Sequence, residues 1–339
     1  MSTKEEVKAL WKLCFNDSDE FVDLYFEQRY KDEINVAARE DGRVVAALQM
    51  IPYPMTFCGE TISTAYISGA CTHPDYRGRG IMRRLLTDAH RRMYQEEVLL
   101  SSLIPAHDWL FEYYGLSGYA PSFGYVNQKV ALRELHPAAA CTVTDETDNR
   151  HLLAERYHYF SAQMKKRPCC IQHPREDFLI ILEDLRLSRG KMLVARRNHH
   201  IVGMAFCVKE DNFLLVKELL ADDERVRDSL LVEASRLYGT EKVNCLQPSF
   251  IDSLYLGMSR VIHAGRVLRL IARKYPGLEM HIHIEGDEAI PENDGYYTLN
   301  GGRCLRGWQA GVEYRPCTIR DFTRLLFTAE HPYMSLMLD

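Results

Sequence analysis

Hydrophobic positions along the first 130 residues follow two alternating periods, one helical and one extended. Apolar residues every three to four positions indicate amphipathic helices, and strict alternation of apolar and polar residues indicates half-buried strands. Asp41-Gly42 separates two extended runs and predicts a hairpin turn. We expect Pro52 and Pro54 to end the second run, because proline cannot donate to a strand ladder. The elements expected here are helices over 5–15, 20–30, 81–95 and 106–114 and strands over 33–39, 43–51, 61–71, 98–103 and 126–132.

A similar order of elements recurs in the second half of the chain. The segment from Glu134 to Asn149 is rich in alanine and polar residues, which is typical of a linker. The turn Ala221-Asp222-Asp223-Glu224 then takes the place between a strand and a helix, with no glycine and three acids, so it would repel an anion. The elements expected after the linker are helices over 149–164, 175–186 and 226–238 and strands over 191–196, 201–209 and 212–219. From Val261 the pattern changes to a helix over 266–272, short strands over 278–285, 295–300, 303–307 and 311–315, and a closing helix over 319–326.

Composition limits the class of protein. A chain of 339 residues predicts two or three domains, and 46% hydrophobic with 26% charged residues is typical of a soluble globular protein. The net charge of −5 argues against a nucleic-acid partner bound through a global basic field. The chain has no run of 18 apolar residues, and its first 30 residues are rich in charge, so we expect no transmembrane helix, no signal peptide, no membrane partner and a cytoplasmic location.

The cysteines and histidines show no metal-binding spacing. None of the ten cysteines forms a Cys-x-x-Cys pair, and Cys169-Cys170 are adjacent, so reduced and mostly buried thiols are expected. His281 and His283 alternate on a predicted strand and would face one side. A solvent-facing or hydrogen-bonded pair is the simpler interpretation, and we expect no metal.

The most informative segment is a basic turn between the β-prone run 66–71 and the helix that begins at Ile81. Gly78 and Gly80 let the backbone approach a ligand closely, and the first N–H groups of a helix have no partner within it. Four arginines add positive charge to this segment: Arg77, Arg79, Arg83 and Arg84. The turn lacks the Lys-Ser/Thr of a P-loop and the distant acid of a dinucleotide site. It therefore predicts a site for a phosphate or pyrophosphate.

A second motif follows about 30 residues later, where Phe111-Glu112-Tyr113-Tyr114-Gly115 predicts a helix that leads into Leu116-Ser117-Gly118-Tyr119. The order of strand, Arg-Gly-x-Gly helix and Tyr-Gly-x-x-Gly-Tyr resembles the GNAT N-acetyltransferases, whose turn holds the acetyl-CoA pyrophosphate. Met82 departs from the GNAT pattern, which has a small residue there. The Eis (enhanced intracellular survival) type also has a bulky apolar residue at that position and shares Thr-His-Pro-x-x-Arg-x-x-Gly. The likeness is dense over residues 60–126.

The resemblance implies a mixed fold, α/β with α+β parts, in which two GNAT-like domains in tandem precede a small sterol-carrier-protein-like domain. It implies a catalytic acetyl-CoA-binding domain over 1–133 and a degenerate GNAT-like domain without CoA over 145–262. The short third domain would span 263–339 and end in the active site. Enzymes of this type form trimers or hexamers, so a homo-oligomer is implied as well.

The resemblance also implies how acetyl-CoA is held. The strand 66–72 would splay from its neighbour and offer free amides to the pantetheine arm and the acetyl oxygen, although a plain buried strand is the alternative. Cys71 has no histidine paired with it in the sequence, so a covalent role is disfavoured. The implied cofactor-binding residues are Ala70, Cys71, Thr72, Arg77, Gly78, Arg79, Gly80, Ile81, Met82 and Arg83.

Two catalytic residues are implied. Tyr114 matches the tyrosine that protonates the CoA sulfur, and a phenol with a pKa near 10 still carries its proton at neutral pH. Tyr113 and Tyr119 are the alternatives, the latter more typical of a core aromatic. The segment 332–339 is apolar to its penultimate residue, so it should dock, and the α-carboxylate of Asp339 would act as general base. A tail that packs only on its own domain is the simpler interpretation.

The function implied is acetyl transfer from acetyl-CoA to a primary amine of a small cationic molecule, including aminoglycoside-like amines. Two other classes stay open: an aminoacyl or peptidyl transferase of double-GNAT type that uses charged transfer RNA, and a non-catalytic lipid- or ligand-binding protein. The intact glycine turn argues against the first. Candidate residues for the amine pocket are Phe26, Glu27, Asp108, Trp109, Phe111 and Glu112.

Overall fold

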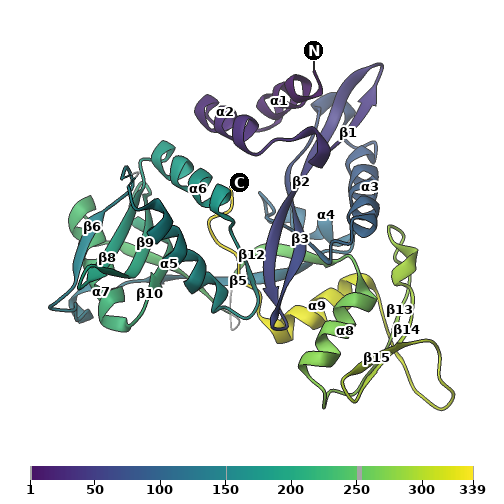
Figure 1. Cartoon of the computed structure of the whole chain (residues 1–339). Helices are drawn as coiled ribbons and strands as arrows, with labels where there is room; N and C mark the ends of the chain where they lie inside the picture. The colour runs from purple at the N-terminus through teal and green to yellow at the C-terminus, as the bar shows by residue number, and fades with distance from the viewer. Residues whose placement is uncertain (1, 150, 250–253, 339) are drawn as a thin grey trace. The chain divides into compact units, whose positions relative to one another are not determined.

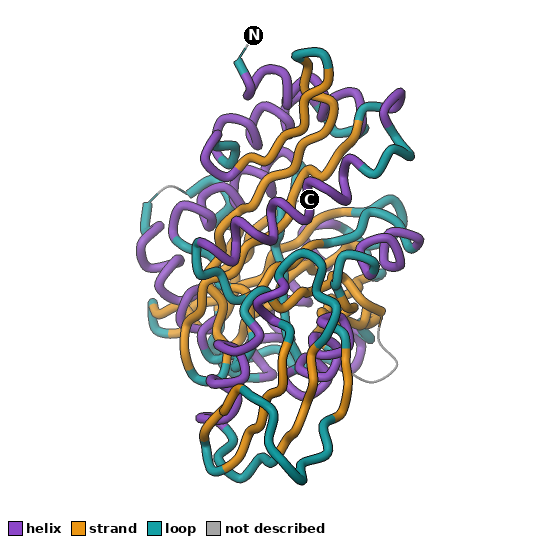
Figure 2. Tube along the Cα trace, turned by 90° about the vertical axis from the view of Figure 1, so that its right-hand side faces the viewer, coloured by secondary structure: helices purple, strands orange, loops and turns teal. Residues whose placement is uncertain are grey.

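The computed structural model describes residues 2–149, 151–249 and 254–338, which Figure 1 draws as a labelled ribbon. These residues form two compact units. The first contains the chain up to Gly124 together with Tyr255–Pro332, and the second contains Tyr125–Leu254 together with Tyr333–Leu338. Figure 2 shows helices and strands interleaved along the trace. The expected mixed α/β class is confirmed, whereas the division into three domains stays a prediction.

The first unit contains a sheet with the strand order β1-β2-β3-β4-β12. β3 pairs with β4 in parallel, and the other neighbours are antiparallel. The strands are β1 (Asn35–Glu40), β2 (Arg43–Phe57), β3 (Glu60–Thr72), β4 (Leu100–Leu103) and β12 (Leu254–Val261), and the helices in this part are α1 (Thr3–Cys14), α2 (Asp19–Gln28), α3 (Ile81–Gln95) and α4 (Trp109–Gly115). The apolar face of α3 packs into the core because Ile81, Leu85, Leu86, Ala89 and Met93 recur at helical spacing and are all buried.

The expected end of the second strand at Pro52 and Pro54 is wrong. β2 continues to Phe57, and both prolines pair with β3, at Ala65 and Ser63. β1 stops pairing at Gln49, so within this unit the prolines lie where only one side of β2 has a neighbour. A missing N–H is tolerated at such a position.

A smaller sheet in the same unit has the order β15-β14-β13-β16. Its elements are β13 (Met280–Ile284), β14 (Gly295–Asn300), β15 (Arg303–Arg306) and β16 (Arg315–Cys317), with the helices α8 (Ala264–Lys274) and α9 (Ile319–Glu330). The strand expected over 311–315 is displaced to β16. Gly311 has a φ of 78° and lies in a turn that the Val312 N–H closes by donating to the Gln309 carbonyl.

The second unit contains a sheet with the order β5-β11-β10-β9-β8-β6. Its elements are β5 (Ala120–Lys129, which begins in the first unit), β6 (Thr142–Asp145), α5 (Leu153–Lys165), β7 (Cys170–Ile171), α6 (Arg175–Leu187), β8 (Lys191–Arg197), β9 (His200–Lys209), β10 (Leu214–Ala221), α7 (Glu224–Tyr238) and β11 (Val243–Pro248). The segment expected to be a plain linker contains β6, which pairs antiparallel with β8. The sequence pattern did not predict this strand, because Val143 is the one apolar residue among its four. Val143 is partly buried and the other three residues are exposed.

The end of the described chain docks on the second unit. Tyr333 donates its N–H to the Cys169 carbonyl at 2.9 Å, and its own carbonyl accepts from the Ile171 N–H at 3.0 Å. The hydroxyls of Tyr333 and Ser335 both donate to the buried carboxylate of Glu218, at 3.0 and 2.6 Å. The tail therefore packs rather than frays, as its apolar composition predicts.

Candidate functional site

A β-bulge in β3 shapes the backbone that leads into the basic turn. Opposite β2, the pairing changes from Gln49 with Ser68 to Ala47 with Cys71, so β3 has one more residue than its partner between the two pairs. Gly69, at a φ of 60°, supplies the positive φ within this bulge. A Cβ at this glycine would lie 2.1 Å from the Trp11 ring, so only glycine fits. The sequence pattern did not predict the bulge.

Beyond the bulge, β3 has no strand beside it on the β4 side. The parallel pairing of β3 with β4 ends at Tyr66 and Ser102, and β4 itself ends at Leu103. β3 continues to Thr72. Within the described residues, the edge of β3 over 67–72 is therefore left without a ladder partner. Such an edge offers backbone donors and acceptors to a bound molecule.

The turn after β3 leaves the first amides of α3 unpaired. Gly80 is the N-cap of α3 in the left-handed region, with a φ of 72°, and it has no side chain to cap the helix. The first helical bond runs from the Arg84 N–H to the Gly80 carbonyl, and among the described residues no protein group accepts from the amides of 79–83. A Cβ at Gly78 or Gly80 would meet no atom within 4 Å. The backbone thus faces open space with its donors exposed.

Exposed arginines surround these amides. Arg77 donates to the Thr72 carbonyl at 3.1 Å, and Arg79 donates to the Asp75 carbonyl at 2.8 Å and lies over the Tyr76 ring. Arg83 pairs with Glu288 at 3.0 Å, but both side chains are largely exposed, so the ion pair is weak. The guanidinium groups of Arg77, Arg79 and Arg84 donate to backbone carbonyls, and none of them pairs with a carboxylate of the described residues, so their charge stays available to an anion.

The two apolar side chains at the start of α3 pack inward. Ile81 is 3% exposed and belongs to the core, and Met82 packs against the same core. Ile81 is buried and Met82 is partly buried, whereas the arginines of the turn are exposed. What Ile81 and Met82 offer to a ligand at the turn is therefore their backbone N–H groups.

Tyr114 lies in the last turn of α4, 8% exposed, and its ring packs edge-on against Tyr113 and Tyr119. Burial raises the pKa of its phenol well above the ordinary value, and the neighbouring Tyr113 and Cys71 raise it further. The phenol therefore stays protonated at every physiological pH. No protein acceptor takes its hydroxyl proton within the described residues, so the O–H remains available to a ligand.

Tyr119 is bound into a buried polar network instead. Its hydroxyl lies 2.7 Å from the Ser101 Oγ and 3.1 Å from the His90 Nε2. Arg260 donates its Nε–H to the His90 Nδ1 at 3.2 Å and pairs with Asp287 at 2.6 Å. Burial, with Arg260 beside it, lowers the pKa of His90, so the ring is neutral and donates from Nε2 to Tyr119. Tyr119 is thus a core residue, in agreement with the prediction that it is a core aromatic.

Two thiols lie beside the turn. Cys71 is buried, and the neighbouring Cys14 together with burial raises its pKa well above the usual range, so it is no thiolate nucleophile. Cys14, at the end of α1, donates to the Thr72 carbonyl at 3.4 Å. The Cys71 thiol, and then the Arg77 guanidinium, lower the pKa of Cys14 to about 6. Sequence reasoning did not single out Cys14, because its neighbours Cys71 and Arg77 are 57 or more residues away.

The expected amine-pocket residues divide into two groups. Phe26 is fully buried in an aromatic cluster with Trp11 and Tyr30, so it cannot line a cleft. Glu27, Asp108, Trp109 and Glu112 are exposed and Phe111 is half-buried. Asp339, the expected base, lies outside the described residues.

The thiols and histidines of the described chain show no metal site. All ten cysteines are free, half of them buried, and in the described part of the chain no three His, Cys, Asp or Glu side chains form a group suited to a metal ion. His283 stacks on Tyr296 with ring centroids 4.0 Å apart, and His281 lies 3.3 Å from the Thr298 hydroxyl. Each described helix is also too short or too polar to span a bilayer.

Comparison with known proteins assigns the first part of the chain. Residues 2–122 match the family model described as an acetyltransferase (GNAT) domain. Among proteins of curated function, none matches the chain in sequence.

Solved structures share the fold at low identity. A probable N-acyltransferase of Enterococcus faecalis is 16% identical, with a TM-score of 0.76 over 96% of this chain and 87% of its own. Eis1 from Mycobacterium abscessus is 11% identical, with a TM-score of 0.74 over 95% and 86%. A GCN5-related N-acetyltransferase from Kribbella flavida is 18% identical, with a TM-score of 0.72 over 99% and 95%. The chain carries a GNAT acetyltransferase domain, and the expected enzyme class, an acyltransferase, is confirmed.

Proposed function

We propose that the protein transfers an acetyl group from acetyl-CoA to a primary amine of a small cationic molecule, as an enzyme of the Eis type. One observation carries the proposal: α3 begins with free amides behind two open glycines, beside exposed arginines. This arrangement suits a pyrophosphate, because the amides donate and the helix dipole and guanidinium groups supply positive charge. The proposed contacts run from Ala70, Cys71 and Thr72 through residues 77–83.

The bound thioester would supply an activated acetyl carbonyl. The open edge of β3 would hold the pantetheine arm and polarise the acetyl oxygen through backbone amides near Ala70–Thr72. Tyr114 would donate its proton to the sulfur as the amine nitrogen takes the acetyl group. Its raised pKa keeps the proton in place until a thiolate forms. A neutral amine is required, so a base must accept the proton that the amine loses.

The role of Asp339 as that base stays a prediction from the resemblance. Asp339→Asn preserves the α-carboxylate and should retain most activity, whereas removal of Leu338-Asp339 should lower the rate roughly 10²-fold or more, the scale of a lost general base. Acetyl-CoA affinity should not change in either variant. Full activity of the truncated enzyme would assign the proton to water or to a side chain such as Glu112.

The decisive experiment titrates acetyl-CoA into the protein by calorimetry and then follows thiol release in the presence of polyamines, aminoglycosides and lysine-like amines. Binding with amine-dependent release supports the proposal. Binding without release for any amine would leave a CoA-binding protein that is no small-amine transferase. An absence of binding would exclude acetyl-CoA as the donor, and favour the transfer-RNA-dependent class.

A further inference from the structure

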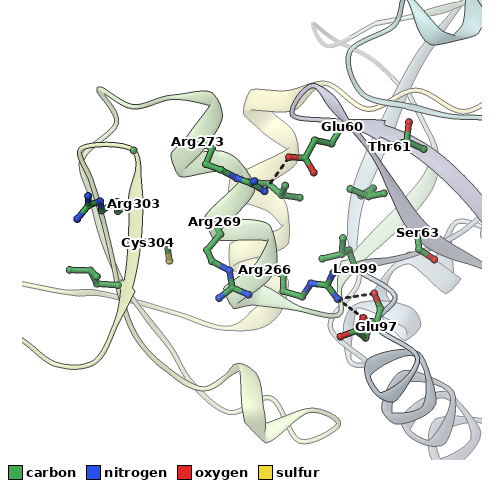
Figure 3. A pocket seen from close by; sticks show the side chains of 14 residues that line it. Glu60, Thr61, Ser63, Glu97, Leu99, Arg266, Arg269, Arg273, Arg303 and Cys304 are labelled. Atoms are coloured by element: carbon green, nitrogen blue, oxygen red, sulfur yellow. Dashed lines mark hydrogen bonds and ion pairs between the residues drawn. The ribbon is translucent and has the colours of Figure 1, made fainter.

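A second cationic pocket lies in the first unit, apart from the turn. It has a volume of about 620 Å³, within the range of small-molecule sites. One wall is α8, the second is the start of β3 with the residues that follow α3, and the third is the β14–β15 hairpin (Figure 3). Its four arginines are Arg266, Arg269 and Arg273 of α8 and Arg303 of β15.

Two of these arginines have structural partners. Arg266 lies 3.5 Å from both the backbone carbonyl and the carboxylate of Glu97, so it neutralises the C-terminal end of α3. Arg273 pairs with Glu60 at 3.1 Å. Figure 3 shows both pairs as dashed lines on either side of Arg269. The positive charges of Arg266 and Arg273 are therefore balanced by carboxylates of the protein and need no ligand.

Arg269 and Arg303 have no such explanation. No carboxylate oxygen of the described chain lies within 4.0 Å of either guanidinium, and both residues are exposed. Arg266, Arg269 and Arg273 follow one another at spacings of three and four on one helix face, where like charges repel and destabilise a helix. Four guanidinium groups and two carboxylates leave the pocket with a net charge of +2 in a chain whose net charge is −5.

The rest of the lining is apolar or carries hydroxyls. Leu99 and Leu270 are buried in the wall, Leu305 is 54% exposed on the hairpin, and Thr61 and Ser63 add hydroxyl groups. A bare inorganic anion would leave this apolar surface uncovered. The combination matches an organic phosphate, since arginine pairs with phosphate oxygens in fork geometry and a monoester carries close to two negative charges.

The pocket is separate from the pyrophosphate turn. The turn precedes the first residue of α3, whereas Glu97 and Leu99 follow its last residue. A helix of 15 residues is about 22 Å long, so one small anion cannot contact both ends. We propose that this pocket binds a small phosphate monoester with an apolar or planar body, with Arg269 as its principal charged ligand. The proposal does not depend on the transferase function.

The test is calorimetry on the full chain with phenyl phosphate as the probe, in the presence and absence of CoA. Inorganic phosphate and phenol represent the two halves of the probe, and each should bind more weakly than phenyl phosphate. Arg269→Ala should weaken phenyl phosphate binding about 10- to 100-fold, the scale of one charge-assisted bond, and Arg269→Lys should weaken it less. Arg91→Ala is the matched control, because Arg91 is an exposed arginine of α3 outside the pocket, and it should bind as the wild type does.

Several results would overturn the proposal. One is a failure of phenyl phosphate to bind the wild type, and another is equal binding to wild type and Arg269→Ala, whose folding is checked by its unchanged melting temperature. Loss of phenyl phosphate binding when CoA is added would show that the probe binds at the pyrophosphate turn and not in this pocket. A concentration-dependent oligomer in which Arg269→Ala weakens self-association, with no phosphate binding, would show that an acidic surface of a second copy occupies the pocket. A protein that binds the probe but not CoA would support the pocket and refute the transferase proposal.

Discussion

The two units each contain a strand, a turn and a helix of 15 residues in the same order, and the two turns carry opposite chemistry. β3 leads through Gly80 into α3, and β10 leads through Asp223 into α7. At the first N-cap there is no side chain, and the amides face open space. At the second, the Asp223 carboxylate accepts from the Val226 N–H at 2.9 Å and caps the helix from within.

Neighbouring side chains extend the contrast. The first turn is surrounded by exposed arginines, whereas two of the three carboxylates of the second turn, those of Asp222 and Asp223, are paired with protein groups. Arg197 contacts Asp223 at 3.0 Å, and Tyr159 and Gln163 both donate to Asp222. The Asp223 carboxylate lies where a bound anion would accept from the first amides of α7, and its own negative charge opposes a pyrophosphate there. The comparison indicates that the N-cap residue decides whether the first amides of the helix stay open to a ligand or are capped by the protein itself.

The strongest test makes the first turn resemble the second. Arg79→Glu together with Gly80→Asp places a carboxylate at the N-cap of α3 and reverses one charge. Acetyl-CoA affinity should fall by about 10²-fold or more, because several charge-assisted bonds are lost and a like charge is added. Calorimetry measures the loss, and Arg91→Glu on the same helix is the control for net charge. Unchanged affinity in a folded double variant would refute the assignment of the turn.

The next test addresses Tyr114, for which the second unit has no proposed counterpart. Tyr114→Phe should leave acetyl-CoA affinity intact and lower kcat about 10²-fold, the usual scale for a lost general acid. Steady-state rates and calorimetry separate the two effects. Tyr113→Phe, which removes the adjacent hydroxyl, should keep most of the rate. The reverse result would transfer the role to Tyr113.

Thiols beside the two turns differ in their surroundings. The Cys71 thiol and then Arg77 lower the pKa of Cys14 to about 6, whereas burial raises the pKa of Cys141 even though Arg197 lies near it. The lowered pKa gives Cys14 a larger thiolate fraction than Cys141 at neutral pH, so iodoacetamide should alkylate Cys14 at least about tenfold faster, even though a low pKa reduces nucleophilicity.

Peptide mass spectrometry as a function of pH gives both rates. The Cys14 rate should rise through pH 6 and then level off. Arg77→Ala should move that midpoint upward, because a positive charge next to the thiolate is lost. Equal rates for Cys14 and Cys141 would show that Cys71 and Arg77 do not activate the thiol beside the first turn.

The smallest expected effect is at the second turn. Asp223→Ala removes the cap of α7 and should lower Tm by roughly 2–4 °C without any change in acetyl-CoA binding. The N–H of Val226 and Arg197 lower the pKa of Asp223, so its stabilisation is present above the ordinary aspartate pKa near 4 and is lost as pH falls below it. The Tm difference between wild type and variant should therefore be constant at neutral pH and shrink below pH 4. A loss of acetyl-CoA binding would show that the second turn is not only scaffold.

The sequence by itself determined most elements of secondary structure. The helix expected over 81–95 has those bounds in the structure, and 175–186 differs from α6 by one residue, because apolar spacing and cap residues are local properties. The sequence also determined the basic glycine turn, since its residues are contiguous and a helix start always leaves free amides. The acidic second turn was identified for the same reason.

Only the tertiary structure decided the features that depend on distant residues. Position 69 must be glycine because the Trp11 ring fills the space of a side chain, the prolines of β2 lie beyond its pairing with β1, and Cys14 acquires its low pKa from Cys71 and Arg77. The free edge of β3 arises because β4 is too short to pair with it further. Periodicity and motif spacing depend on a residue's neighbours in the sequence. Burial, strand register and electrostatic fields are set by neighbours in space, and these were decided by the fold.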